Sequence, residues 1–194
     1  MHRRELLAIL PSALILHASR CFGADSKKPP LQLFGTTLKL AKRSDLRKVF
    51  RQSGLRPTRE DDRYWVDTYK VPDGILEGAT EFEAAYLLTT GTFAYARYKF
   101  PGFMDTKLVG KVVRMVQGKY GAPIMTVGRE ELGPMMVEWS AGDGMWIQVS
   151  RDWPDTTTYL KYEDTMANAI LGKEMSEEKA RQELEKSKSQ TNAF

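Results

Sequence analysis

The stretch TKLVGKVVRMVQGKYGAP, residues 106–123, carries the most regular hydrophobic pattern in the chain. Its apolar residues recur with the spacing of one helix face, and basic residues lie between them. Gly121 stands where a left-handed helix end is favoured, and Pro123 cannot continue a helix. We therefore predict an amphipathic helix with a marked end. Its apolar side consists of Leu108, Val109, Val112, Val113, Met115, Val116 and Tyr120.

A second stretch, SDLRKVFRQSGLRP at residues 44–57, repeats this plan. Ser44 can cap the start of a helix, and Gly54 and Pro57 mark its end. We expect Phe50 in this helix and Val113 in the later one to be core residues. Two helices of the same design in one chain indicate that a single structural unit is used twice.

Three segments with strand character follow each helix. RYWVDTYKV, EFEAAYLLTT and TFAYARYKF follow the first helix, and MMVEWS, MWIQVS and TTTYLKYED follow the second. The turn AGDG gives the strongest hairpin signal, and LQLFGTTLKL before the first helix is typical of an extended lead-in. The predicted fold class is α+β, with two tandem helix plus three-strand antiparallel units and both helices packed on one face of the sheet.

The first residues have the pattern of an export signal. MHRRE is a charged start, LLAILPSALIL is an apolar run too short to span a bilayer, and CFGADS offers small residues for cleavage. The alternative is a buried N-terminal helix, which would lack a capping signal. Cys21 could be the attachment point of a lipid anchor, but a lipid-attachment site has a small residue immediately before its cysteine, and here that residue is Arg20. The predicted organisation is a signal peptide at 1–24, a linker at 25–30, a first unit at 31–104, a second unit at 105–171 and a charged tail at 172–194.

Removal of such a leader would restrict the chemistry of the mature chain. His2, His17 and Cys21 are the only histidines and the only cysteine of the chain. Without them, a Ser-His-Asp triad, a Cys-His pair and the usual zinc sites cannot form from this chain alone. The formal charge falls from +4 to +2, because three arginines and one glutamate leave. We predict no catalytic residue, no metal site, no cofactor and no nucleic-acid partner.

Basic residues follow the outer side of both predicted helices. If the helices lie side by side, these residues form one cationic surface suited to anionic lipid headgroups, phosphates or an acidic partner. The alternative is a pair of ordinary solvated helix faces, since the acidic run at residues 60–62 lies close in sequence and is typical of a solvated turn. The basic set is Arg43, Arg47, Lys48 and Arg51 in the first helix and Lys107, Lys111 and Arg114 in the second.

Alternation along the strands divides their side chains between two faces of the sheet. Met145, Ile147 and Val149 fall on one side of MWIQVS, which puts Trp146 on the other. Aromatic residues on an uncovered sheet face would form a binding platform, whereas a strand, loop or tail over them would make them structural. The residues expected on this second face are Trp146, Trp65, Tyr69 and Tyr95.

The C-terminal sequence predicts a short helix followed by a charged tail. DTMANAIL is typical of a short helix, capped by Asp164 or Thr165 and ending at Gly172. SEEKARQELEKSKSQ, after it, has glutamates at its start and lysines at its end, which favours a helix, but few apolar residues. We expect this tail to be exposed or frayed.

The helix ending in KYGAP, followed by an antiparallel meander and present twice, resembles the beta-lactamase-inhibitor-protein-like architecture. The small outer-membrane-assembly lipoproteins of the SmpA/OmlA type carry a similar single unit. The resemblance implies an exported, non-enzymatic binding module of the bacterial envelope, periplasmic or secreted, whose partner is another envelope protein. The alternative is a periplasmic hydrolase that uses carboxylate, Ser, Lys or Tyr side chains. Against it, the chain shows no Gly-x-Ser-x-Gly or Ser-x-x-Lys motif in a suitable setting.

The position of the small residues after the apolar run predicts a mature N-terminus between about Phe22 and Asp25. Mass spectrometry of the protein purified from its native host measures this directly. An intact Met1 would contradict the export prediction and would return both histidines and the cysteine to the mature chain.

Overall fold

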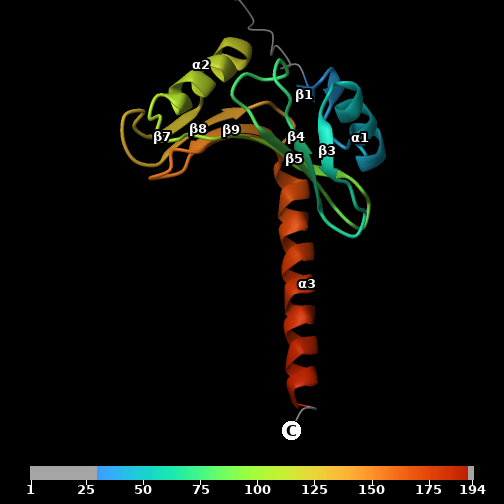
Figure 1. Cartoon of the computed structure of the whole chain (residues 1–194). Helices are drawn as coiled ribbons and strands as arrows, with labels where there is room; N and C mark the ends of the chain where they lie inside the picture. The colour runs from blue at the N-terminus through green and yellow to red at the C-terminus, as the bar shows by residue number, and fades with distance from the viewer. Residues whose placement is uncertain (1–29, 192–194) are drawn as a thin grey trace, which may run out of the picture.

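The structure is a computed structural model that describes residues 30–191 (Figure 1). The predicted signal peptide and the linker up to residue 29 lie outside the described residues. The helices are α1 (Arg43–Gln52), α2 (Leu108–Tyr120) and α3 (Thr165–Thr191). The strands are β1 (Gln32–Leu33), β2 (Thr36–Thr37), β3 (Arg56–Arg59), β4 (Val66–Lys70), β5 (Glu81–Tyr86), β6 (Phe93–Phe100), β7 (Met125–Gly128), β8 (Met135–Ser140), β9 (Met145–Arg151) and β10 (Thr158–Asp164).

Eight of these strands form one antiparallel sheet in the order β3-β4-β5-β6-β10-β9-β8-β7. The α+β class with a large antiparallel sheet is therefore confirmed. The expected three strands after each helix are wrong, because four follow each one. The additional strands, β3 and β7, occupy the two edges of the sheet. All four residues of each are exposed, so neither has the alternation that identifies a strand in a sequence.

Side chains from α1 and α2 join one hydrophobic core on the same sheet. Phe50 of α1 is fully buried as predicted, with its ring 4.9 Å from that of Phe82. In α2 the buried valines are Val109, Val112 and Val116, while Val113 is only half-buried against the core. Val109, Val112 and Val116 of the predicted apolar side are therefore buried, and the prediction of Val113 as a buried core residue is wrong. Figure 1 draws α2 over the half of the sheet that contains β7, β8 and β9, and α1 beside β3.

The hairpins follow from local backbone chemistry. The predicted AGDG turn joins β8 to β9, and its residues Gly142, Asp143 and Gly144 all have positive φ, at 81°, 50° and 73°. Glycine reaches this region without strain, and Asp tolerates it better than most residues. The lead-in segment folds back on itself as the small β1–β2 hairpin, whose turn residues Phe34 and Gly35 have φ of 50° and 77°.

Helix α3 is continuous over 27 residues, so the predicted break at Gly172 is wrong. Asp164 provides the predicted cap, because its Oδ1 accepts the backbone N–H groups of Met166 and Ala167 at 3.1 and 3.2 Å. A glycine inside a helix costs about 1 kcal/mol and does not by itself end it. Beyond the glycine, spaced ion pairs such as Lys173–Glu177 support the helix. Among the described residues, no helix is both long and apolar enough to cross a membrane.

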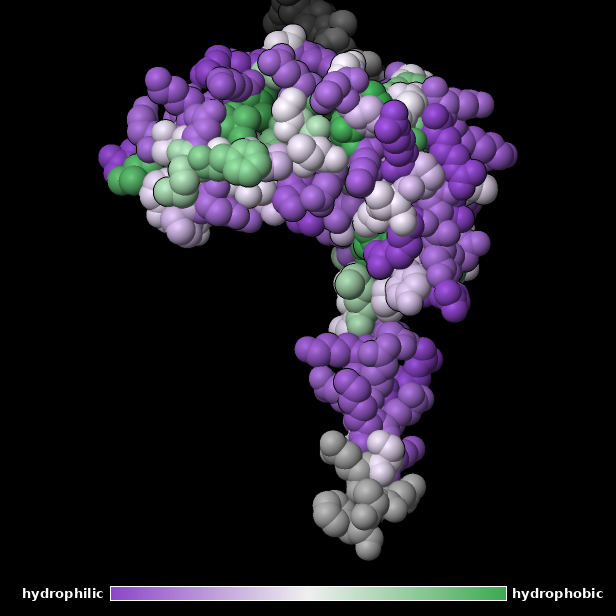
Figure 2. Space-filling view, viewed as in Figure 1, coloured by the Kyte–Doolittle hydropathy of each residue, from purple (hydrophilic) through white to green (hydrophobic). Residues whose placement is uncertain are grey.

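Helix α3 leaves the sheet on the side opposite α1 and α2 (Figure 1). Ala167 and Leu171 pack against Ala85 and Ala94 in a second, smaller apolar cluster. Further along, the helix projects from the body, and its surface is hydrophilic except near its root (Figure 2). The sheet thus separates a thick core on one face from a single helix root on the other.

The core position of Val112 can be tested by charge insertion. We expect Val112→Asp to lower the free energy of unfolding by roughly 3–5 kcal/mol, because it buries an unpaired carboxylate. The free energy of unfolding of a whole domain is roughly 5–15 kcal/mol. Met115→Asp, on the exposed side of the same helix, should change it by no more than about 0.5 kcal/mol. Urea unfolding measures both. Equal effects would show that the helix face is assigned wrongly.

Candidate functional site

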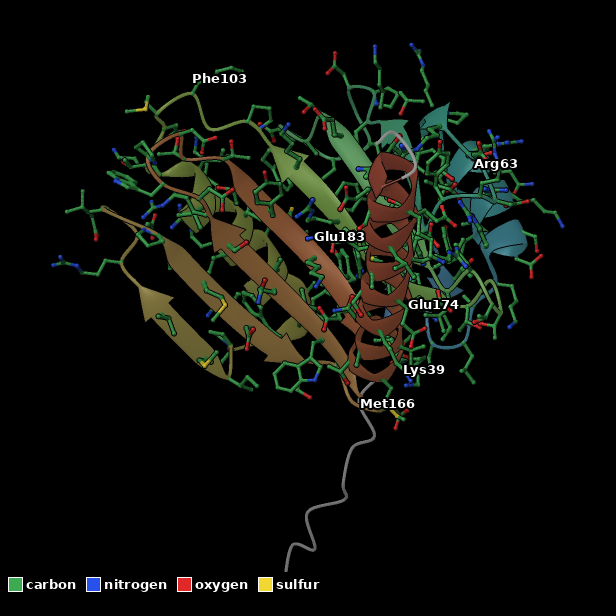
Figure 3. The ribbon with its side chains drawn as sticks, turned by 90° about the horizontal axis from the view of Figure 1, so that it is seen from below. Lys39, Arg63, Phe103, Met166, Glu174 and Glu183 are labelled. Atoms are coloured by element: carbon green, nitrogen blue, oxygen red, sulfur yellow. The ribbon has the colours of Figure 1, made fainter. Side chains whose placement is uncertain are left out.

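The side of the sheet from which α3 projects is here called the open face. Figure 3 views it from below and shows strands beside α3 that no helix covers. Side chains of adjacent strands meet there in rows set by the pairing register. One row consists of Thr68, Glu83, Arg97, Lys161, Gln148 and Glu138, and the next consists of Val66, Ala85, Tyr95, Glu163, Trp146 and Ser140.

Charged and aromatic side chains contact one another on the open face through cation–π contacts and ion pairs. The guanidinium of Arg97 lies 4.7 Å from the ring centre of Tyr159, and its Nη2 lies 2.9 Å from Glu83 Oε1. The ammonium of Lys161 lies 5.0 Å from the ring centre of Tyr95. Burial, together with the nearby Glu83 carboxylate, raises the pKa of Tyr95 to about 12. Tyr95 is therefore neutral at physiological pH.

Trp146 lies on this face, as the alternation predicted, and its side chain is half-buried. A cavity of about 200 Å³ adjoins it, lined also by Glu138, Gln148, Glu163 and Thr165. Gln148 Nε2 donates to Glu138 Oε1 at 2.8 Å, and Lys161 pairs with Glu163. We call Trp146, Glu138, Gln148 and Glu163 the Trp146 patch. It joins one indole to two carboxylates.

A second hollow of about 400 Å³ lies on the half of the open face that β4, β5 and β6 build. Its lining alternates acidic and basic groups. Lys99 Nζ lies 3.2 Å from Glu81 Oε1, and Arg97 pairs with Glu83 as described above. Because these charges already face opposite charges, the hollow has no strong preference for one sign of ligand.

Two of the predicted aromatic residues are not available on the open face. Trp65 lies under the root of α3, where its Nε1 donates to Glu174 Oε2 at 3.1 Å. The same carboxylate accepts the backbone N–H of Leu88 at 2.9 Å and the hydroxyl of Thr89 at 2.7 Å. Tyr69 is on the opposite side, buried in the core 5.7 Å from the ring of Phe50. The tail thus covers Trp65, and the prediction for Tyr69 was wrong by one step of the alternation.

The predicted basic residues mostly face acidic groups of the same chain. In α1, Arg51 pairs with Glu60 and Lys48 lies 3.5 Å from Asp45. In α2, Lys111 forms an ion pair with Asp105 at 3.5 Å, and Arg114 forms one with Glu130 at 3.3 Å. Lys107 is exposed at the start of α2. Two residues of the acidic run, Glu60 and Asp62, thus pair with arginines of α1, whereas Asp61 pairs with Arg63.

Arg43 and Arg47 converge on a single buried carboxylate, Asp67 of β4. Arg43 donates to Asp67 from Nε and Nη2 at 3.1 and 2.6 Å, and Arg47 donates from the same two nitrogens at 2.8 and 2.9 Å. Asp67 has no exposed surface, and Arg43 is nearly as buried. The prediction of Arg43 as a surface residue is wrong, because it precedes Leu46 by three residues and Phe50 by seven and so shares their side of the helix.

The Asp67 carboxylate remains charged in this setting. Burial alone would raise its pKa, but the hydrogen bonds from Arg47 and Arg43 outweigh burial and hold the pKa below its usual range. Arg43 also donates to the backbone carbonyls of Asp61 and Tyr64, both at 2.8 Å. The cluster therefore fixes α1, β4 and the loop between β3 and β4 together. It is a structural anchor rather than a binding surface.

Arg151, at the end of β9, was missed in the sequence and has a comparable role in the other half of the sheet. It is buried and donates to backbone carbonyls of Thr106, Arg129, Glu130 and Gly133 at 2.5 to 2.9 Å. A usable signal was present, because this arginine continues the buried alternation of β9. Asp67 likewise occupies a buried position of β4. A charged residue in the buried phase of a strand requires a buried partner.

Comparison with known proteins adds little to this geometry. No protein-family model matches the chain, and no curated protein matches it. Among solved structures, a DUF4309-family protein of Bacillus subtilis, YjgB, is similar over 71% of this chain and 87% of its own, with 15% identity and a TM-score of 0.43. A similarity of this size establishes neither family nor function.

The Asp67 anchor predicts a specific pH dependence. The folded pKa of Asp67 lies below its unfolded value, so its stabilisation is full above the unfolded pKa and is lost as pH falls through the folded one. We expect Asp67→Asn to cost roughly 3–5 kcal/mol at pH 7, because Arg43 is left buried without its counter-charge. Urea unfolding should show this deficit shrinking below about pH 4.

The matched control for this measurement is Asp45→Asn, in the first turn of α1. Asp45 is exposed and pairs only at 3.5 Å with Lys48, so its removal should cost no more than about 1 kcal/mol. A deficit of Asp67→Asn that stayed constant from pH 7 to pH 3 would contradict an ionised Asp67 as the source of the stabilisation.

Proposed function

We propose that this chain is an exported, non-enzymatic protein-binding module of the bacterial envelope, periplasmic or secreted, and that its partner docks on the Trp146 patch. The observation that carries this proposal is a half-buried indole, on a part of the sheet face that α3 leaves uncovered, beside an open cavity. Tryptophan at such a position can become the desolvated centre of an interface, where few residues supply most of the binding free energy.

The helix faces are the weaker of the two predicted surfaces. Their arginines already face Asp67, Asp62, Glu60 and Glu130. An anionic lipid, phosphate or acidic partner would have to displace these internal partners before it gained a contact. Exposed ion pairs are also weak and are screened by salt. On the open face Glu163 is likewise paired with Lys161, but Trp146 is uncharged, and a partner that covers it breaks no ion pair.

The chemistry of the Trp146 patch indicates what the partner presents. An indole face attracts a cation, and the carboxylates of Glu138 and of Glu163, the latter paired with Lys161, line the cavity beside it. Gln148 is bound to Glu138 and fixes that carboxylate in place. An arginine side chain of the partner satisfies both demands, since it stacks on aromatic faces and donates to carboxylates. We infer that the partner inserts an arginine, or a lysine, next to Trp146.

The proposal also includes an internal repeat in the fold. We infer that the segments α1 to β6 and α2 to β10 are two tandem units, each now a helix plus four strands. Their mirrored order in the sheet supports this reading. On this view the resemblance to the beta-lactamase-inhibitor-protein-like and SmpA/OmlA-type architectures reflects the repeated unit, and α3 is an addition to the second one.

The binding proposal is tested by Trp146→Ala in capture of envelope proteins on the immobilised chain. We expect the variant to lose the captured partner while keeping the thermal unfolding midpoint, because the side chain lies outside both apolar clusters. The matched control is Trp153→Ala, an exposed tryptophan on the β9–β10 loop, which should capture normally. Capture by the wild type should survive high salt.

Two outcomes would overturn the proposal. Unchanged capture by Trp146→Ala would remove the patch from the interface. Loss of capture by triple charge reversal at Arg51, Lys111 and Arg114, with Trp146→Ala unaffected, would place the interface on the helix faces instead.

A further inference from the structure

The two edges of the eight-stranded sheet differ in chemistry. One edge is β3, with the sequence RPTR, and the other is β7, with the sequence MTVG. An edge strand presents unpaired backbone groups to any second strand, and natural proteins commonly protect such edges with charges or proline. The β3 edge has both protections, in Arg56, Pro57 and Arg59. The β7 edge has neither.

The β7 edge is also apolar and exposed. Ile124, Val127 and the following Leu132 expose 56%, 52% and 57% of their surface, and Met125 is exposed as well. In Figure 2 hydrophobic side chains reach the left margin of the body, where Figure 1 draws β7. Scattered apolar residues need no explanation, but a set along an unpaired strand combines free backbone groups with apolar area.

Strand β7 is held in place by its pairing with β8 and by the loop that follows it. Its residues pair with β8 from Met125 opposite Glu138 to Gly128 opposite Met135. Arg151 binds the carbonyls of Arg129, Glu130 and Gly133 in the loop that follows. A strand fixed at its end in this way loses little conformational freedom when another strand adds to it.

We propose that β7 is a dimerisation edge, which pairs antiparallel with β7 of a second copy of this chain. Antiparallel residues directly opposite each other lie on the same face of a sheet. A register that opposes Thr126 with Thr126 of the second copy sets Met125 opposite Val127 of that copy. Both open faces then lie on the same side of one continuous sheet, and the two Trp146 patches remain free.

The partner is a second copy because the strand complements itself. MTVG has no charged residue, so pairing it with its own copy brings no like charges together, whereas β3 would place arginine opposite arginine. Such a two-fold contact is closed, since each copy uses the same edge. The outer edges of the dimer are then both β3, and their proline and arginines stop further growth.

The test uses the full chain and two charged variants of the exposed Thr126. We expect the wild type to show a reversible, concentration-dependent dimer by sedimentation equilibrium up to about 1 mM, the weak limit for a short edge contact. Thr126→Lys and Thr126→Glu should each raise the dimer Kd by about tenfold or more, because like charges meet at the two-fold axis. An equimolar mixture of the two variants should restore the dimer.

Thr58→Lys on the opposite edge is the matched control and should dimerise like the wild type, as should Trp146→Ala. Thermal unfolding confirms that each variant is folded. A wild-type chain that stays monomeric up to about 1 mM overturns the proposal. So does a dimer that both Thr126 variants retain, or one that the mixture fails to restore. Because the Trp146 patch is on the open face and not on the edge, these results are independent of partner capture.

Discussion

The pairing of β6 with β10 is the interaction on which the rest of the molecule depends. These strands end the two halves of the fold, and six residue pairs, from Phe100 opposite Thr158 to Tyr95 opposite Glu163, join them. Without this ladder each half would expose an edge and a core of its own. With it, α1 and α2 share one core, and the open face runs across both halves. Since β10 leads directly into α3, the ladder also decides where that helix stands.

Buried arginines stabilise each half away from this ladder. In the first half Arg43 binds Asp67 and two loop carbonyls, and in the second half Arg151 binds carbonyls of the loop between β7 and β8. Both arginines therefore fix the connection between the first and second strands that follow a helix. They do so with opposite electrostatics. Asp67 compensates Arg43, whereas neutral carbonyl dipoles surround Arg151. A guanidinium suits the second role because its five donors lie in a fixed plane.

The sequence predicts the parts of this structure that have a repeating pattern. Helices, the central strands and the AGDG hairpin have such patterns, and Phe50 and Trp146 were assigned to the correct sides. The edge strands could not be predicted, because an exposed four-residue strand has no buried phase. Arg43 was misplaced for a different reason. Its charge suggested the surface, while its helical phase put it beside Leu46 in the core. For the candidate site, alternation along the strands predicts on which face of the sheet a side chain lies. It does not predict that α3 covers Trp65, because that contact joins residues far apart in the sequence.

The form of α3 limits where a partner of the open face can bind. Its distal part is mostly polar, with Leu184 as an exposed apolar residue, and it forms ion pairs within the helix, such as Lys179 with Glu183. The exposed apolar residues of the helix lie mostly near its root, at Met166, Ile170 and Met175. Thr165 at that root also lines the cavity beside Trp146. A protein that docked on Trp146, as proposed, would therefore also meet the root of α3 as one wall of the same site.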